Sequence, residues 1–249
     1  MTLLGNFDLL FVGVAIAATG ILGAVVYLEN KKSITNKTFL VFCLITIAWG
    51  IVNYAHYQTS SPEMALWILR LVVFLGLWQA FSLFQLFHVF PKEKIDFSEK
   101  HEYFLVPLVI VTAILTLTPL VLSKVSEVSA TGRVLKIENG PGIFLFGLVG
   151  VGLVLSALFL LLKKFFKSKQ EEHIQLRFIL FGTLLMFALI ITFNFIFPAF
   201  LDDANFVPLG AVFILPFVVF TAYAILKYHL LGVKVIATEI LTFVLTMAV

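Results

Sequence analysis

The chain has 249 residues, of which 61% are hydrophobic and only 12% are charged, and its formal net charge is +3. This composition leaves no room for a water-soluble domain of useful size, so the chain is expected to form one membrane domain. The small excess of basic residues favours contact with anionic lipid headgroups and argues against a nucleic-acid surface. A single cysteine, Cys43, excludes an internal disulfide framework.

Seven long apolar stretches follow one another along the chain. Each has roughly the 20 residues that a helix needs to cross the hydrocarbon core of a bilayer. The predicted spans are Phe7–Glu29, Thr38–Tyr57, Met64–Phe90, Phe104–Leu122, Ile143–Phe166, Ile174–Phe200 and Val207–Leu231. The sequence therefore predicts an all-α fold, a polytopic membrane bundle of seven transmembrane helices that has the lipid bilayer as its first partner.

The lysines and arginines between the spans alternate from crowded loops to nearly empty ones. Thirteen of them follow the first, third, fifth and seventh spans, three lie on the opposite side, and Arg70 within a span completes the seventeen. Cytoplasmic loops of membrane proteins carry the excess of basic residues. The pattern therefore predicts that the N-terminus is outside and the C-terminus is cytoplasmic.

One external segment, from Ser123 to Gly142, is long enough to form structure of its own. It places valine, leucine and isoleucine residues on both sides of the turn-prone residues Ser129 to Gly132. Two apolar runs around a short polar turn are typical of a β-hairpin. We predict a short external hairpin here, with an irregular loop as the alternative.

Small residues recur where helices must approach closely. Gly13, Ala17, Gly20 and Ala24 lie along one side of the first span, and Gly147, Gly150 and Gly152 lie in the fifth. Membrane helices that pack by van der Waals contact use such residues. They do not distinguish a neighbour in the same chain from a second copy, so a homodimer stays open. Pro216 predicts a kink in the seventh span.

Ionisable groups are sparse inside the spans. No aspartate or glutamate lies in the middle of any span, where proton relays and ion-coupled transporters usually keep such groups. The seventh span also has no lysine before Lys227 that could hold a retinal Schiff base. We find no glycine-rich nucleotide loop, no metal-spaced cluster and no nucleophile with a partnered base. The sequence therefore predicts no catalytic residue, metal or cofactor in this chain.

Three polar residues of different spans converge on the outer third of the membrane. Asn53, Arg70 and Asn194 reach that level when the spans alternate in direction. We predict a buried polar site there, lined by Trp49, Trp67 and Trp78, for an external or lipophilic ligand. The alternatives are that Arg70 snorkels about 9 Å to the headgroups and that the aromatic residues only pack or anchor.

Three segments carry a resemblance to a known family. The sequence after the seventh span, residues 222–241, resembles the junction that follows the N-terminal seven-helix region of bacterial membrane histidine kinases. The third span is similar to that of the family through Trp67, Arg70, Phe74, Gly76, Phe90 and Pro91. The sixth is similar through Gln175, Leu176, Arg177 and Gly182. The chain departs from the family at Gln79 and Ala80, where a proline is usual.

The resemblance implies a sensory input module of the bacterial inner membrane. It would detect an external or membrane-borne cue and pass it to a cytoplasmic output domain, a kinase in much of the family. Residues 1–235 are expected to be the sensor domain, and residues 236–249 the start of an eighth, truncated signalling helix. Transmission would use Tyr228, Gly232, Lys234 and Glu239. The alternatives are a small permease or lipid-handling protein, and a non-catalytic membrane scaffold.

Overall fold

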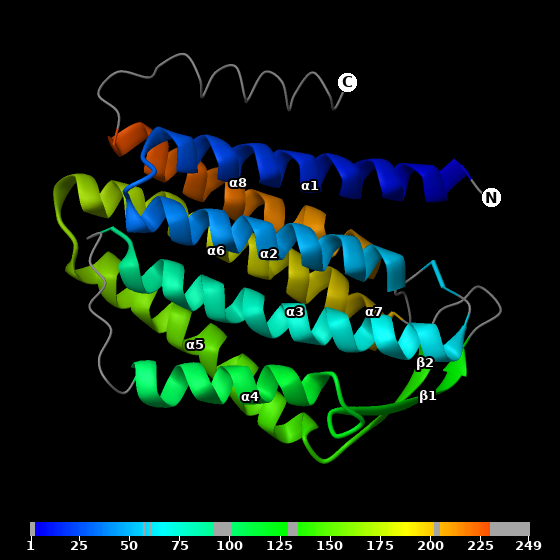
Figure 1. Ribbon diagram of the computed structural model, residues 1–249. Coiled ribbons are helices and arrows are strands. Elements are labelled where there is room, and N and C mark those ends of the chain that lie inside the picture. The colour runs from blue at the N-terminus through cyan, green and yellow to red at the C-terminus, as the bar shows by residue number, and fades with distance from the viewer. Residues whose placement is uncertain are drawn as a thin grey trace. The chain divides into compact units, whose positions relative to one another are not determined.

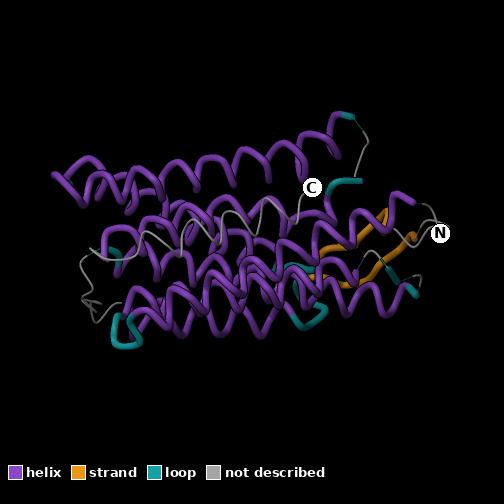
Figure 2. The backbone as a smooth tube through the Cα atoms, turned by 90° about the horizontal axis from the view of Figure 1, so that it is seen from above, coloured by secondary structure: helices purple, strands orange, loops and turns teal. Residues whose placement is uncertain are grey.

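Helices account for nearly all of the described backbone (Figures 1 and 2). The computed structural model describes residues 3–56, 58–59, 61–91, 101–128, 134–201 and 205–229. Within these residues, six helices are long and apolar enough to cross a membrane, and a shorter apolar helix covers Tyr103–Thr116. The chain is therefore a multi-pass membrane protein. It divides into two compact units, one of Met1–Cys43 with Leu161–Val249 and one of Leu44–Leu160.

The first unit is built around its last helix. Its elements are α1 (Leu3–Glu29), the start of α2 (Ile34–His56), the end of α5 (Ile143–Lys167), α6 (Gln170–Ile191), η2 (Thr192–Ile196), α7 (Phe197–Phe200), η3 (Val207–Leu209) and α8 (Gly210–His229). Helix α8 packs against both α1 and α6, and it is the most deeply buried of the six candidate spans. The core of this unit therefore lies along α8.

Two glycines let helices of the first unit approach closely. A Cβ added at Gly182 of α6 would lie 2.8 Å from the Cβ of Phe220 and 3.3 Å from the carbonyl oxygen of Pro216, both in α8. A Cβ at Gly23 of α1 would lie 2.8 Å from the Cβ of Cys43 in α2. Without a hydrophobic force between helices in lipid, such contacts supply the packing energy. The buried thiol of Cys43 is part of one of them.

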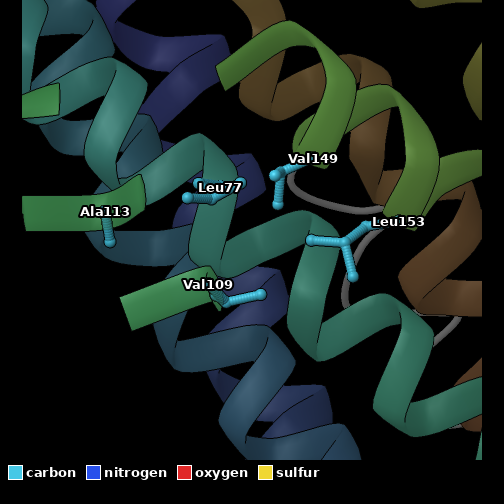
Figure 3. Close-up of a cluster of buried hydrophobic side chains, with 5 residues drawn as sticks. All are labelled: Leu77, Val109, Ala113, Val149 and Leu153. Carbon is cyan, nitrogen blue, oxygen red and sulfur yellow. The ribbon is translucent and has the colours of Figure 1, made fainter. Parts of the chain in front are cut away.

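The second unit contains the hairpin and the middle of the chain. It holds the rest of α2 and of α5. Its other elements are α3 (Pro62–Val89), η1 (His101–Leu105), α4 (Val106–Thr116), β1 (Leu122–Val128) and β2 (Val134–Asn139). Helices α3, α4 and α5 meet in a cluster of five buried side chains, which Figure 3 labels: Leu77, Val109, Ala113, Val149 and Leu153. This cluster holds α4 in place although α4 is short.

Helix α3 has clear start and stop signals. The hydroxyl of Ser61 accepts a hydrogen bond from the backbone N–H of Met64, and Pro62 occupies the first turn, where its missing N–H costs nothing. Glu63 lies favourably at the positive end of the helix. The helix ends at Val89, just before Phe90 and Pro91, because proline disfavours the helical conformation of the residue before it.

The predicted hairpin is confirmed as an antiparallel pair of β1 and β2. Lys124 and Glu138 face each other and form an ion pair of 3.2 Å between Nζ and Oε1. The hairpin closes at its base through Gly140, whose N–H donates to the carbonyl of Val121. A Cβ at Gly140 would collide with the Leu120 carbonyl. The turn itself, residues 129–133, lies outside the described residues.

The fourth span is shorter than the sequence predicts. The prediction of Phe104–Leu122 was wrong at its end, because α4 stops at Thr116 and β1 starts at Leu122. Pro119 has no N–H with which to continue the helix. The hydroxyls of Thr116 and Thr118 donate to the carbonyls of Ala113 and Leu115 and close the last turn. The whole apolar helix Tyr103–Thr116 spans about 21 Å, less than the roughly 30 Å of a hydrocarbon core.

The sixth span is one apolar stretch in sequence but is interrupted in structure. The π-helical turn η2 separates α6 from α7, and the N–H of Phe197 donates to the carbonyl of Thr192, five residues back. Pro198 explains the wide turn, since its ring would clash with the carbonyl of Asn194 in a regular helix. The predicted eighth helix, residues 236–249, lies outside the described residues.

The contact at Gly182 gives a testable consequence for stability. Replacing Gly182 with alanine should lower the stability of the protein, since the new methyl group must push apart two backbones, at a cost of about 1–3 kcal/mol. Gly147→Ala is the matched control, because a Cβ at Gly147 meets nothing within 4 Å and alanine favours the helix by about 0.5–1 kcal/mol. Thermal unfolding of the purified protein in detergent measures both. Equal stability of the two variants would contradict the close contact.

Candidate functional site

Arg70 of α3 is buried and bonded to the base of the hairpin. Its side chain is only 5% exposed. The Nε and Nη2 atoms donate to the carbonyl of Leu122 at 3.2 and 2.8 Å, and Nη2 also reaches the carbonyl of Ser123 at 3.4 Å. The guanidinium charge is therefore met by backbone dipoles where α4 has ended and β1 begins. Snorkelling to the headgroups does not describe this side chain.

Trp67 covers the other side of the guanidinium. The ring lies 5.0 Å from the Cζ of Arg70, in the geometry of a cation–π contact. Trp67 itself is 56% exposed, so its outer face is open to whatever surrounds α3. Of the predicted site residues, Trp67 and Arg70 are the pair that the structure brings together directly.

The other predicted residues of the second unit are on helices α2 and α3. Asn53 is buried in α2, and Trp49 of α2 lies opposite Gly76 of α3, where an added Cβ would be 3.7 Å from the indole nitrogen. Trp78 packs edge-on against Phe74 and Phe81 of its own helix. The two tryptophans are thus in packing positions, and their ligand-binding role stays a prediction.

A polar contact in the same unit was not predicted as a pair. Gln79 of α3 donates from Nε2 to the hydroxyl oxygen of Thr46 in α2, at 3.1 Å. Gln79 thus joins two helices by a hydrogen bond within the apolar region. The signal was available, since both residues are polar positions in neighbouring spans. Their register could not be derived from the sequence.

Asn194 belongs to the first unit and lies in the π-helical turn η2. Its Oδ1 is buried and has no hydrogen-bond partner among the described residues. The neighbouring Phe193 stacks on Phe213 at 5.1 Å and contacts Phe197 and Phe206. A buried acceptor in an aromatic surrounding is costly unless a water or ligand donor meets it.

The end of α8 carries a second polar group of the first unit. Lys227 donates from Nζ to the hydroxyl of Tyr223 at 2.5 Å and lies over its ring. Tyr223 in turn packs edge-on against Phe178 of α6, with ring centroids 4.9 Å apart. These contacts tie the end of α8 to α6. The side chain of Tyr228 and the whole of Gly232, Lys234 and Glu239 lie outside the described residues.

The polar groups of these sites offer hydrogen-bond donors and acceptors. A guanidinium donates hydrogen bonds in a planar fork, and amide side chains both donate and accept them. In the described part of the chain no three His, Cys, Asp or Glu side chains gather in a group that could hold a metal ion. The sequence missed the partners of Arg70, because backbone carbonyls leave no mark in a sequence.

One protein family has a sequence model that matches this chain. The match covers residues 11–234, and the family is described as the N-terminal 7TM region of histidine kinase. It includes both units and nearly all of the described residues. No curated protein and no solved structure matches the chain.

The bonds of Arg70 predict what its loss would do. Arg70→Met should loosen the hairpin, since each hydrogen bond to a charged group contributes about 1.5–3 kcal/mol. Arg70→Lys should fall between Arg70→Met and the unchanged protein, because an ammonium cannot reproduce the paired Nε and Nη2 donors. Hydrogen exchange of peptides covering residues 122–128 and 134–139 should accelerate about tenfold or more in Arg70→Met.

Arg177→Met is the control for this measurement. Arg177 is exposed and lies in the first unit, so its removal takes away the same charge without touching the hairpin. Exchange of the two strand peptides should stay unchanged in this variant. Strand exchange that is equally slow in Arg70→Met and the unchanged protein would rule out the anchoring role.

Proposed function

This chain belongs to the family of N-terminal 7TM regions of histidine kinases, and we propose on that basis that it detects a cue and passes it to a cytoplasmic output domain. The family match carries the proposal, since it covers both units. The chain is the membrane input region of such a protein. Catalysis would belong to the output domain, because the sequence predicts no catalytic residue in this chain.

The cue would act at the outer end of the second unit. The hairpin is bonded to α3 through Arg70, so a ligand that shifts the hairpin would also act on α3. Trp67 presents an exposed aromatic face beside that bond. We propose that an external or lipophilic ligand binds among Arg70, Asn53, Trp49, Trp67 and Trp78 of the second unit. A ligand moves such an equilibrium only by binding one state more tightly.

The output would leave through α8. This helix is packed on α6 at Gly182 and Pro216, and its end is held by Tyr223 and Lys227. Helix α8 contains Pro216 and packs against a glycine, and packed interfaces of this kind switch between discrete arrangements. Tyr228, Gly232, Lys234 and Glu239 would then carry the movement onward.

The transmission route can be tested in the full-length protein. Cysteines are placed at Phe178 and Tyr223 in a Cys43→Ala background and joined by a short bismaleimide, which fixes α6 to α8. The cross-link should hold the protein in one state. Its autophosphorylation rate in proteoliposomes should therefore be clearly higher or clearly lower than that of the Phe178→Cys single variant treated with the same reagent. Equal activity in both would contradict transmission through α8.

The main alternative function is that of a small permease, and it can be distinguished from a sensor by experiment. A downstream reading frame that encodes a coiled-coil helix with a phosphoacceptor histidine and an ATP-binding domain would favour the sensor. Solute flux through proteoliposomes without any kinase activity would favour the permease. A scaffold would show neither.

The proposed orientation places the N-terminus outside and the C-terminus in the cytoplasm. Its support is the alternation of basic residues between the loops. Single cysteines at Lys32 and Lys169 should resist an impermeant thiol reagent added to intact cells, whereas cysteines at Glu63 and Asn139 should react. All four positions are exposed, so protection reports the side of the membrane and not burial. Permeabilised cells, in which all four should react, are the control, and the reverse pattern in intact cells would invert the orientation.

A further inference from the structure

The corner between α5 and α6 carries the densest basic cluster of the chain. Five basic residues lie between positions 163 and 177, namely Lys163, Lys164, Lys167, Lys169 and Arg177. The two acidic residues of the same stretch, Glu171 and Glu172, do not balance them. Lys163, Lys167, Lys169 and Arg177 are exposed, and none of these four forms an ion pair within the described part of the chain.

The corner is a built structure. The hydroxyl of Ser168 donates to the carbonyl of Phe165 at 2.8 Å, and Nδ1 of His173 lies 3.1 Å from that carbonyl and 3.2 Å from the hydroxyl. The ring of His173 stacks on Phe165 with centroids 4.4 Å apart. Gln170 adopts a φ of 53°, a left-handed conformation that non-glycine residues rarely take. The cluster is therefore held on a fixed support.

The start of α6 adds hydrogen-bond donors to the cluster. Lys169 occupies the N-cap position in an extended conformation and provides no side-chain bond to the first turn. The N–H groups there carry the positive end of the helix dipole. Backbone donors and lysine charges of this kind together favour a phosphate.

An apolar surface continues from the basic cluster along α5. Leu162 and Phe166 are 40% and 79% exposed, and they alternate with Lys163 and Lys167 one position further along the helix. Residues four apart lie on the same side of a helix, so a row of apolar side chains runs beside a row of lysines. This pairing matches a molecule with an anionic head and hydrocarbon chains.

We propose that the α5–α6 corner binds the phosphate of an acidic phospholipid, with the acyl chains along Leu162 and Phe166. Basic clusters directly beside a membrane helix attract the anionic headgroups of the bilayer. The bound lipid would fix the corner, and with it the start of α6, to the bilayer surface. The site is independent of the proposed sensory role, because it concerns the contact of the chain with its own membrane.

Native mass spectrometry of the purified chain tests the site, with dioleoyl-phosphatidylglycerol as the probe and dioleoyl-phosphatidylcholine as the neutral comparison. The variant replaces Lys163, Lys167 and Lys169 with glutamine. The matched control replaces Lys31, Lys32 and Lys37, three exposed lysines of the α1–α2 region. Circular dichroism confirms that both variants keep their helices.

The unchanged protein should retain phosphatidylglycerol over phosphatidylcholine. The corner variant should weaken that binding on the order of tenfold or more, while the control variant should change it less than about twofold. Equal weakening in both variants would show that the lipid is held by general charge attraction, and the proposal of a specific site would be wrong. Retention that is unaffected in the corner variant, as expected if an acidic protein surface were the partner, would also overturn it. So would displacement of the lipid by inorganic phosphate, which would indicate a site for free anions.

Discussion

A backbone N–H or C=O inside hydrocarbon has no water to bind, so each one must find a partner within the protein. The long helices meet this requirement by themselves. Where a regular helix stops inside an apolar stretch, a side chain or a modified turn takes over. Arg70 meets the Leu122 carbonyl where α4 has ended, the hydroxyls of Thr116 and Thr118 close its last turn, and a π-helical turn accommodates Pro198. These three irregular features are consequences of that one constraint.

The apolar surroundings also explain why small residues matter for the packing of these helices. Lipid chains are as apolar as leucine, so helices gain little by exchanging lipid for one another unless they approach closely. Gly182 and Gly23 provide such approaches at α8 and α2, whereas Gly13 and Gly147 meet nothing within 4 Å. A small residue in a span is therefore ambiguous until its neighbour is known. The stripe on α1 that the sequence emphasised includes Gly13, while a close approach of α1 to α2 falls at Gly23, outside that stripe.

The sequence predicted the helical membrane fold, the hairpin and the family, because apolar length, turn residues and short motifs are local properties. It did not predict the end of α4. The residues from Leu117 to Leu122 are as apolar as those of a membrane helix, but Pro119 prevents the helix from continuing through them. Burial of Arg70 was one of two predicted orientations, but its partners are the backbone carbonyls of Leu122 and Ser123, which no sequence pattern marks. The bond from Gln79 to Thr46 needed the register of two helices, which no local pattern contains. Contacts between residues that are far apart along the chain could not be predicted from the sequence alone.

The distribution of polar groups also bears on how a signal could be carried. In the second unit the buried charge of Arg70 is met by carbonyls of the hairpin, so moving the hairpin away would leave a guanidinium unpaired at a cost of several kcal/mol. The hairpin and α3 must therefore shift together or not at all. In the first unit, the contact of α6 with α8 depends on backbone atoms at Gly182 and Pro216, which cannot be compressed gradually. Both places favour discrete arrangements over continuous deformation, and a membrane input region needs that property if a weak cue is to change its output.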